Sequence, residues 1–119
     1  EVVPCPVRRL HVPPGMEQAE VETVDLTLAT LRIGPVVLAG VSGEVTVPVG
    51  RAVQAASPLA HTLIVSNANA RIGYLPTDES YDRRTHAAEG CPIVKGHAAR
   101  NIVEGLTRLI ASGLDRHVL

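Results

Sequence analysis

Residues 23–41 read TVDLTLATLRIGPVVLAGV, and this stretch decides the fold. Its first half alternates between apolar and polar residues and is rich in β-branched side chains, which predicts a strand over 24–33. Gly34 and Pro35 then form a turn signal. The short apolar run over 35–41 is typical of a strand that is buried on both faces. We expect the two strands to pair as a hairpin.

Further elements follow toward the C-terminus. Pro48 suits the first turn of a helix, and valines and alanines recur after it at helical spacing, which predicts a helix over 46–57. The run HTLIVS at 61–66 is a second candidate for a buried strand, whereas residues 77–96 are polar and are interpreted as irregular. An amphipathic helix is predicted over 97–112, because its apolar residues form one stripe: Ile102, Val103, Leu106, Leu109 and Ile110.

The order of these elements indicates the fold class. Strands alternate with helices, which is typical of an α/β domain with a mixed sheet and flanking helices. Residues 1–20 contain four prolines and Gly15. We interpret them as a Pro-rich extended leading segment, followed by an α/β domain over 21–119.

The core has to be built almost without aromatic residues. The chain has no Trp, no Phe and only two Tyr, so Val, Leu, Ile and Ala must fill the interior. Such a core is thin for a free-standing domain, and the chain starts at Glu1 without a methionine. We therefore expect part of a larger α/β domain, with an apolar face left uncovered.

Composition and charge exclude several classes of protein. A hydrophobic fraction of 45% with 19% charged residues excludes intrinsic disorder. A net charge of −1, without a basic block and with few aromatics, argues against a nucleic-acid partner. No apolar run approaches the roughly 18 residues of a membrane-spanning helix, so no membrane span is predicted. Cys5 and Cys91 match no metal or redox motif; two unpaired, partly buried thiols are favoured over a disulfide, and the compartment stays open.

Polar residues follow two of the predicted strands. Residues 42–44 (Ser-Gly-Glu) come after the first buried strand, and residues 67–69 (Asn-Ala-Asn) come after the second. Because α/β sheets bind ligands beyond the carboxyl ends of their strands, convergence of these loops is a site hypothesis. Glu44 could bind a metal, accept a proton or face the positive end of the helix dipole, and taken alone the last interpretation is favoured.

The remaining candidate residues give weaker signals. Tyr81 lies in the acidic stretch TDESYD at 77–82, where a tyrosine is usually only an exposed side chain. It still draws attention as one of two tyrosines. The five histidines show no HExxH or other ligand spacing, and no P-loop, GxGxxG or GxSxG motif is present.

Three longer strings together resemble the neutral/alkaline ceramidase family. They are VVLAGVSGEVTVPVGRAV at 36–53, NANARIGYLPTDESY at 67–81 and EGCPIVKGHAARNIVEGLTRLI at 89–110. In that family a buried strand runs into a turn with a glutamate, followed by a threonine and a Gly-Arg pair on a helix. An asparagine, a Gly-Tyr stretch and an acidic loop with a tyrosine come later. The matching residues here are Glu44, Thr46, Gly50, Arg51, Asn69, Gly73, Tyr74 and Tyr81.

The resemblance implies a zinc-dependent amidohydrolase that cleaves the N-acyl amide bond of a ceramide-like lipid. In the family, Zn²⁺ is held by two histidines, a glutamate and a tyrosine. Glu44 matches the glutamate, Tyr81 matches the tyrosine and is also assigned as catalytic, and Asn69 is assigned to substrate binding. The two histidines belong to an upstream half of the catalytic domain that this chain does not contain. We therefore expect the chain alone to be inactive. A secreted or extracytoplasmic location is favoured by the resemblance.

Two features depart from the family pattern. Gly43 stands where the family has proline or alanine, and the segment after Tyr81 lacks the second aromatic residue that many members carry. These departures resemble a ceramidase-like microbial branch whose substrate need not be ceramide. The alternative is a non-catalytic α/β binding or structural module that kept the scaffold and lost the chemistry.

Overall fold

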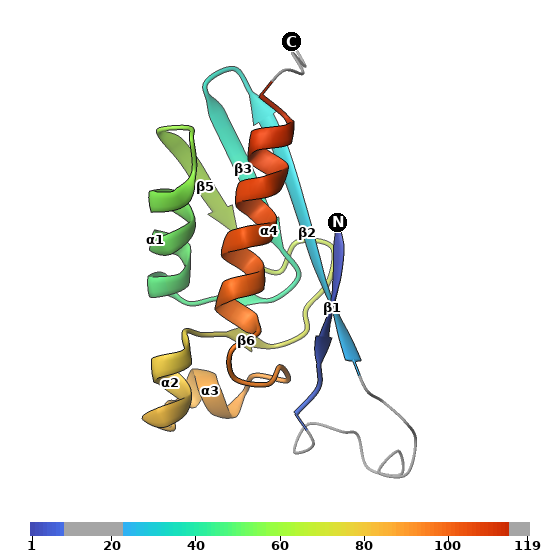
Figure 1. The fold of residues 1–119 in the computed structure, drawn as a ribbon, viewed down its shortest axis with the longest axis vertical. Helices are drawn as coiled ribbons and strands as arrows, with labels where there is room; N and C mark the ends of the chain where they lie inside the picture. Colours follow the sequence, from blue (N-terminus) through green and yellow to red (C-terminus); the bar gives the residue numbers. More distant parts are fainter. Residues whose placement is uncertain (9–22, 115–119) are drawn as a thin grey trace.

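A four-stranded mixed sheet forms the centre of the molecule (Figure 1). The computed structural model describes residues 1–8 and 23–114. The strands lie in the order β1-β2-β3-β5, with bounds β1 Val2–Pro6, β2 Thr23–Ile33, β3 Val36–Val41 and β5 His61–Val65. The first three strands are antiparallel neighbours, whereas β3 and β5 are parallel and are joined through a helix. The predicted hairpin and the predicted α/β class are both confirmed.

Two helices cover one face of this sheet, and Figure 1 shows them side by side in front of the strands. They are α1, Val47–Ala56, with a proline in its first turn, and α4, Ala98–Ser112. Both predicted helices are confirmed. The core lies between these helices and the inner face of the sheet. Its fully buried members include Leu26, Leu28, Ala39, Val41, Val49, Val53, Ile102 and Leu106.

A smaller unit lies at the end of the sheet to which β5 points (Figure 1). It contains the two-stranded parallel sheet of β4, Glu44–Val45, and β6, Tyr74–Leu75. Two short helices complete it, namely α2, Asp78–Asp82, and α3, His86–Glu89. The prediction that residues 77–96 are irregular was therefore wrong. These helices are too short to show a hydrophobic period, and α3 depends on the hydroxyl of Thr85, which accepts from the Ala88 amide.

The opposite face of the sheet carries exposed apolar side chains, and no helix among the described residues packs on it. Across β2, β3 and β5 the register aligns Leu31 with Leu38 and Leu63, and neighbouring rows contain Ile33 and Val65. The exposed fractions are 52% for Leu31, 59% for Ile33, 52% for Leu63 and 40% for Val65. Within the described residues, these exposed side chains agree with the predicted apolar face.

This uncovered face also corrects two predictions of buried strands. β5 is an edge strand, and among its residues only Thr62 is buried. In β3, Val36 and Leu38 on the outer face are partly exposed, so this strand is not buried on both faces. The apolar runs were correct evidence for strands, but a run by itself does not show whether a second layer covers the sheet.

The N-terminal residues contain a strand that was not predicted. Val2–Pro6 forms strand β1 and pairs with the first half of β2, although it was interpreted as part of an extended leading segment. Prolines are tolerated there because β1 lies at the edge of the sheet. Residues 9–20 of that predicted segment, and the first two residues of the predicted domain, lie outside the described residues.

Cys5 and Cys91 are unpaired, as predicted, but fully rather than partly buried. Within the described ranges, no helix has the length and apolar character needed to cross a membrane.

Candidate functional site

The two polar loops that follow β3 and β5 converge at the carboxyl edge of the sheet, as predicted. The backbone amide of Asn67 donates to the carbonyl of Gly43 at 2.9 Å, and the amide of Ala68 donates to the carbonyl of Val41 at 2.9 Å. A third bond joins the amide of Ile72 to the carbonyl of Ser42 at 2.9 Å. The turn at 42–44 and the loop at 66–72 therefore form one hydrogen-bonded unit.

Glu44 lies in this unit with its side chain exposed. Its backbone amide donates to the carbonyl of Gly73 at 2.8 Å, and its pairing with Tyr74 starts the small parallel sheet. The carboxylate itself makes no hydrogen bond or ion pair within residues 1–8 and 23–114. The residue is therefore held by its backbone, while its carboxylate is available to a ligand.

Close neighbours leave no room for a side chain at Gly43, where proline or alanine was expected from the resemblance. A Cβ atom at this position would lie 2.5 Å from Cδ1 of Leu75 and 2.8 Å from the carbonyl oxygen of Gly73. The carbonyl of Gly73 is backbone that accepts the amide of Glu44 at 2.8 Å, so it cannot move away easily. Proline or alanine cannot fit here unless this small sheet is rearranged.

The loop at 66–70 has an unusual backbone. Asn67 and Asn69 adopt positive φ angles of 55° and 67°, a left-handed conformation that asparagine tolerates better than most residues. Asn69 is exposed and lies in the same unit as Glu44. The structure therefore brings Asn69 and Glu44 to the same edge, which is where a substrate-binding residue is expected.

Tyr81 lies on α2, and its hydroxyl is already bonded. The hydroxyl donates to the carbonyl of Ile93 at 2.9 Å and lies 3.0 Å from the thiol of Cys91. Burial and the hydrogen bond with Cys91 raise the pKa of the Tyr81 phenol well above its usual value. In this arrangement Tyr81 is a neutral hydrogen-bond donor.

Tyr81 and Glu44 make their hydrogen bonds to different segments. The strand β6 is bonded to β4 on one side, and on the other the amide of Tyr74 donates to the carbonyl of Gly90 at 3.2 Å. Tyr81 is bonded to the segment that follows Gly90, so β6 lies between the backbone of Glu44 and the anchor of the Tyr81 hydroxyl. No hydrogen bond joins the two side chains in the described residues.

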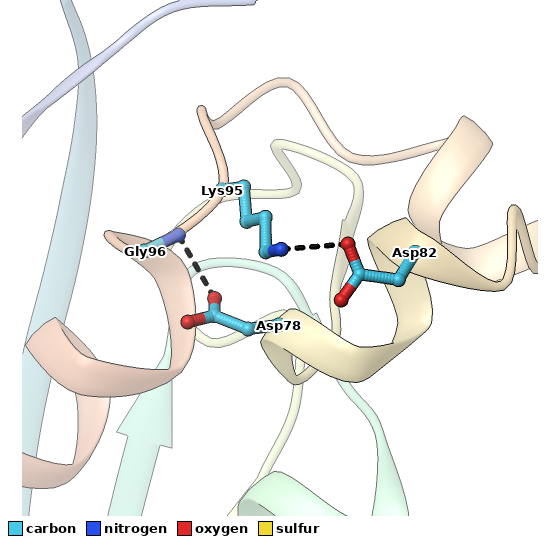
Figure 2. A network of polar contacts seen from close by, with 4 residues as sticks. All are labelled: Asp78, Asp82, Lys95 and Gly96. Carbon is cyan, nitrogen blue, oxygen red and sulfur yellow. Dashed lines mark hydrogen bonds and ion pairs between the residues drawn. The ribbon is translucent and has the colours of Figure 1, made fainter.

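Polar contacts fix the helix that carries Tyr81 (Figure 2). Asp78, at the start of α2, accepts a hydrogen bond from the amide of Gly96 at 2.8 Å. Asp82, at its end, forms an ion pair with Lys95 at 2.6 Å. Figure 2 shows both carboxylates pointing toward the loop that precedes α4. This five-residue helix therefore depends on its neighbours and not on its own length.

Several residues around Tyr81 were not predicted from the sequence. The guanidinium of Arg8 lies over its ring, at 5.2 Å from the ring centre, and Cys91 and Ile93 surround its hydroxyl. Arg8 comes from the N-terminal segment, far from Tyr81 in the sequence. No sequence spacing signals such a contact, because only the tertiary fold brings the segments together.

The described residues fit a metal site only in part. Among them, no three His, Cys, Asp or Glu side chains form a group that could hold a metal ion. Glu44 has the chemistry of an oxygen ligand for Zn²⁺ and is free to act as one. Tyr81 could serve as a second ligand only after its hydroxyl leaves the carbonyl of Ile93.

Comparisons with models of known protein families, with curated proteins and with solved structures found no match to this chain.

Proposed function

We propose that this chain contributes part of the site of a zinc-dependent amidohydrolase similar to neutral ceramidase, acting on the N-acyl amide bond of a ceramide-like lipid. One observation carries the proposal. The free carboxylate of Glu44 lies at the carboxyl edge of the sheet, where the loop that contains Asn69 is hydrogen-bonded to its turn. This is the position at which α/β sheets bind ligands.

Each residue has a separate role in this proposal. Glu44 would bind Zn²⁺ and Asn69 would contact the substrate, while Tyr81 would be the second ligand and a catalytic residue. Zinc, when bound, supplies a Lewis acid that polarises an amide carbonyl. Two oxygen ligands are fewer than the three protein ligands of an ordinary catalytic zinc site. The other two ligands, histidines by the resemblance, would come from outside these residues.

The test compares variants in the polypeptide that the complete reading frame encodes. Zinc content and hydrolysis of a fluorescent N-acyl sphingosine are measured for Glu44→Gln and Tyr81→Phe. We expect both variants to lose most of the bound zinc and of the hydrolysis, because each removes a ligand. Glu104→Gln on the exposed side of α4 and Tyr74→Phe are the matched controls. Unchanged zinc and activity in both site variants would overturn the assignment.

A non-catalytic α/β module is the second candidate, and the bonding of Tyr81 favours it. A hydroxyl held by the Ile93 carbonyl and the Cys91 thiol has a structural role that needs no metal. Under this alternative the complete polypeptide binds no stoichiometric zinc, and Tyr81→Phe lowers only stability.

A further inference from the structure

The N-terminal segment reaches across the molecule to the residues around Tyr81. Arg8 donates through its Nη1 to the carbonyl of Cys91 at 3.3 Å and also to the carbonyl of Ala88. The same guanidinium lies over the ring of Tyr81. One side chain therefore contacts the ring and also the backbone beside the thiol that the Tyr81 hydroxyl touches.

We propose that Arg8 is a positioning residue for Tyr81, holding the phenol ring between its guanidinium and the segment 91–93. The proposal rests on the proposed function in so far as Tyr81 belongs to the site. Arg8 itself touches no reacting group. Arg8 acts on Tyr81 indirectly. It holds the ring in place and fixes the backbone beside Cys91 and Ile93, which face the hydroxyl.

The chemistry of arginine suits this position. Its planar guanidinium can stack on an aromatic face and still direct N–H donors at carbonyl oxygens in the same plane. A lysine ammonium could keep the charge over the ring, but it lacks the flat guanidinium that stacks on the ring while its Nη1 donates to the two carbonyls. The conservative variant Arg8→Lys should therefore restore only part of the effect.

The backbone hydrogen bonds around Arg8 do not depend on its side chain, so the guanidinium can be tested separately. The amide of Arg8 donates to the carbonyl of Pro92 at 2.7 Å, and the amide of Val94 donates to the carbonyl of Pro6 at 3.0 Å. These bonds do not involve the guanidinium, so substitution of Arg8 leaves them available. A change at Tyr81 in such a variant is then assigned to the side chain.

Tyrosine fluorescence gives a direct measurement, because the chain has no Trp and only two Tyr. In a Tyr74→Phe background, Tyr81 alone emits, and quenching by acrylamide reports how often its ring is exposed. Loss of a cation–π contact raises the population of a displaced ring by about two- to fivefold. We expect the quenching constant to rise in Arg8→Gln and to rise less in Arg8→Lys. It should not change in Arg100→Gln, where an exposed arginine of α4 is replaced.

The outcomes separate positioning from general stability. If Arg8→Gln is folded by circular dichroism but has the quenching constant of its parent, the proposal is wrong, even if the variant unfolds at a lower urea concentration. If Arg8→Gln does not fold, Arg8→Lys decides, and an unchanged constant there overturns the proposal as well.

The measurement needs neither zinc nor substrate, so its failure is distinct from failure of the proposed function. If Glu44→Gln and Tyr81→Phe both leave zinc and hydrolysis unchanged while Arg8→Gln still exposes the ring, the proposed function is wrong and the positioning of Tyr81 by Arg8 is retained.

Discussion

Burial changes the pKa of two side chains in this molecule, those of Tyr81 and Cys5. Burial raises the pKa of the Cys5 thiol, and burial together with the Cys91 contact raises the pKa of the Tyr81 phenol. Both groups are therefore neutral in the folded chain at pH values where they start to ionise in the unfolded chain. Each contributes stability that is complete below its unfolded pKa and is lost as the pH rises above that value.

This linkage predicts alkaline destabilisation. The free energy of unfolding should be constant between about pH 7 and 8, and should fall above about pH 9, as the unfolded Cys and then the unfolded Tyr lose protons. Urea unfolding at a series of pH values measures this pH dependence of the free energy of unfolding. Tyr81→Phe should show a shallower fall above about pH 10, with a difference of at most about 1.4 kcal/mol per pH unit. Equal slopes in Tyr81→Phe and the parent would contradict the raised pKa of Tyr81.

At the scale of elements, close approach decides how α4 packs on the sheet. A Cβ atom on Gly105 would overlap Cδ1 of Leu28, a fully buried side chain of β2. Gly50 in α1 differs, since a Cβ atom there would lie 3.5 Å from Cγ1 of Ile64, an ordinary contact distance. Packing therefore requires glycine at Gly105, whereas Gly50 has room for a methyl group.

Alanine at these two positions should have opposite effects. Gly105→Ala should lower the free energy of unfolding by about 1–3 kcal/mol, because an overpacked core has to shift. Gly50→Ala should raise it by up to about 1 kcal/mol, because alanine favours the helix and has room. Urea unfolding of both variants gives the comparison. A stabilised Gly105→Ala variant would show that α4 can move away from β2 without loss.

At the scale of the whole molecule, the two faces of the sheet differ in what covers them. The inner face is buried under α1 and α4, whereas the outer face exposes Leu31, Ile33, Leu63 and Val65. A shallow hollow of about 200 Å³ on this outer face ends at Gly40 and Ala68, beside the loop that contains Asn69. The uncovered apolar surface therefore extends to the edge where the candidate site lies.

The uncovered face should be detectable in solution. The chain should bind a dye such as ANS in its folded state, and the double variant Leu31→Gln/Leu63→Gln should lose most of that signal. Its stability should change by only about 0.5 kcal/mol per site, because both side chains are already half exposed. Val47→Gln, which changes an exposed valine at the start of α1, is the matched control and should keep the signal. A folded parent that binds no dye would contradict an accessible apolar face.

The main helices and strands follow from local periodicity. The alternation over 24–33, the turn at Gly34 and Pro35, and the apolar stripe of α4 each depend on residues close in sequence, so their patterns are visible without a structure. The helices α2 and α3 were missed because turns of four or five residues have no period to detect. Strand β1 was missed because its prolines signal a break, although an edge strand tolerates them.

The sequence by itself determined the α/β class and the hairpin of β2 with β3, since both follow from local patterns and their order along the chain. It gave the meeting of the Glu44 and Asn69 loops as a hypothesis, and the parallel pairing of β3 with β5 in the structure places both loops at one edge. The sequence predicted an uncovered apolar face, but only the tertiary structure decided which side chains form it, because an apolar run is the same whether or not a second layer covers it. Only the tertiary structure placed the Tyr81 hydroxyl on Ile93 and Cys91, under the guanidinium of Arg8. Contacts between segments so far apart in the chain arise from packing, which no local pattern encodes.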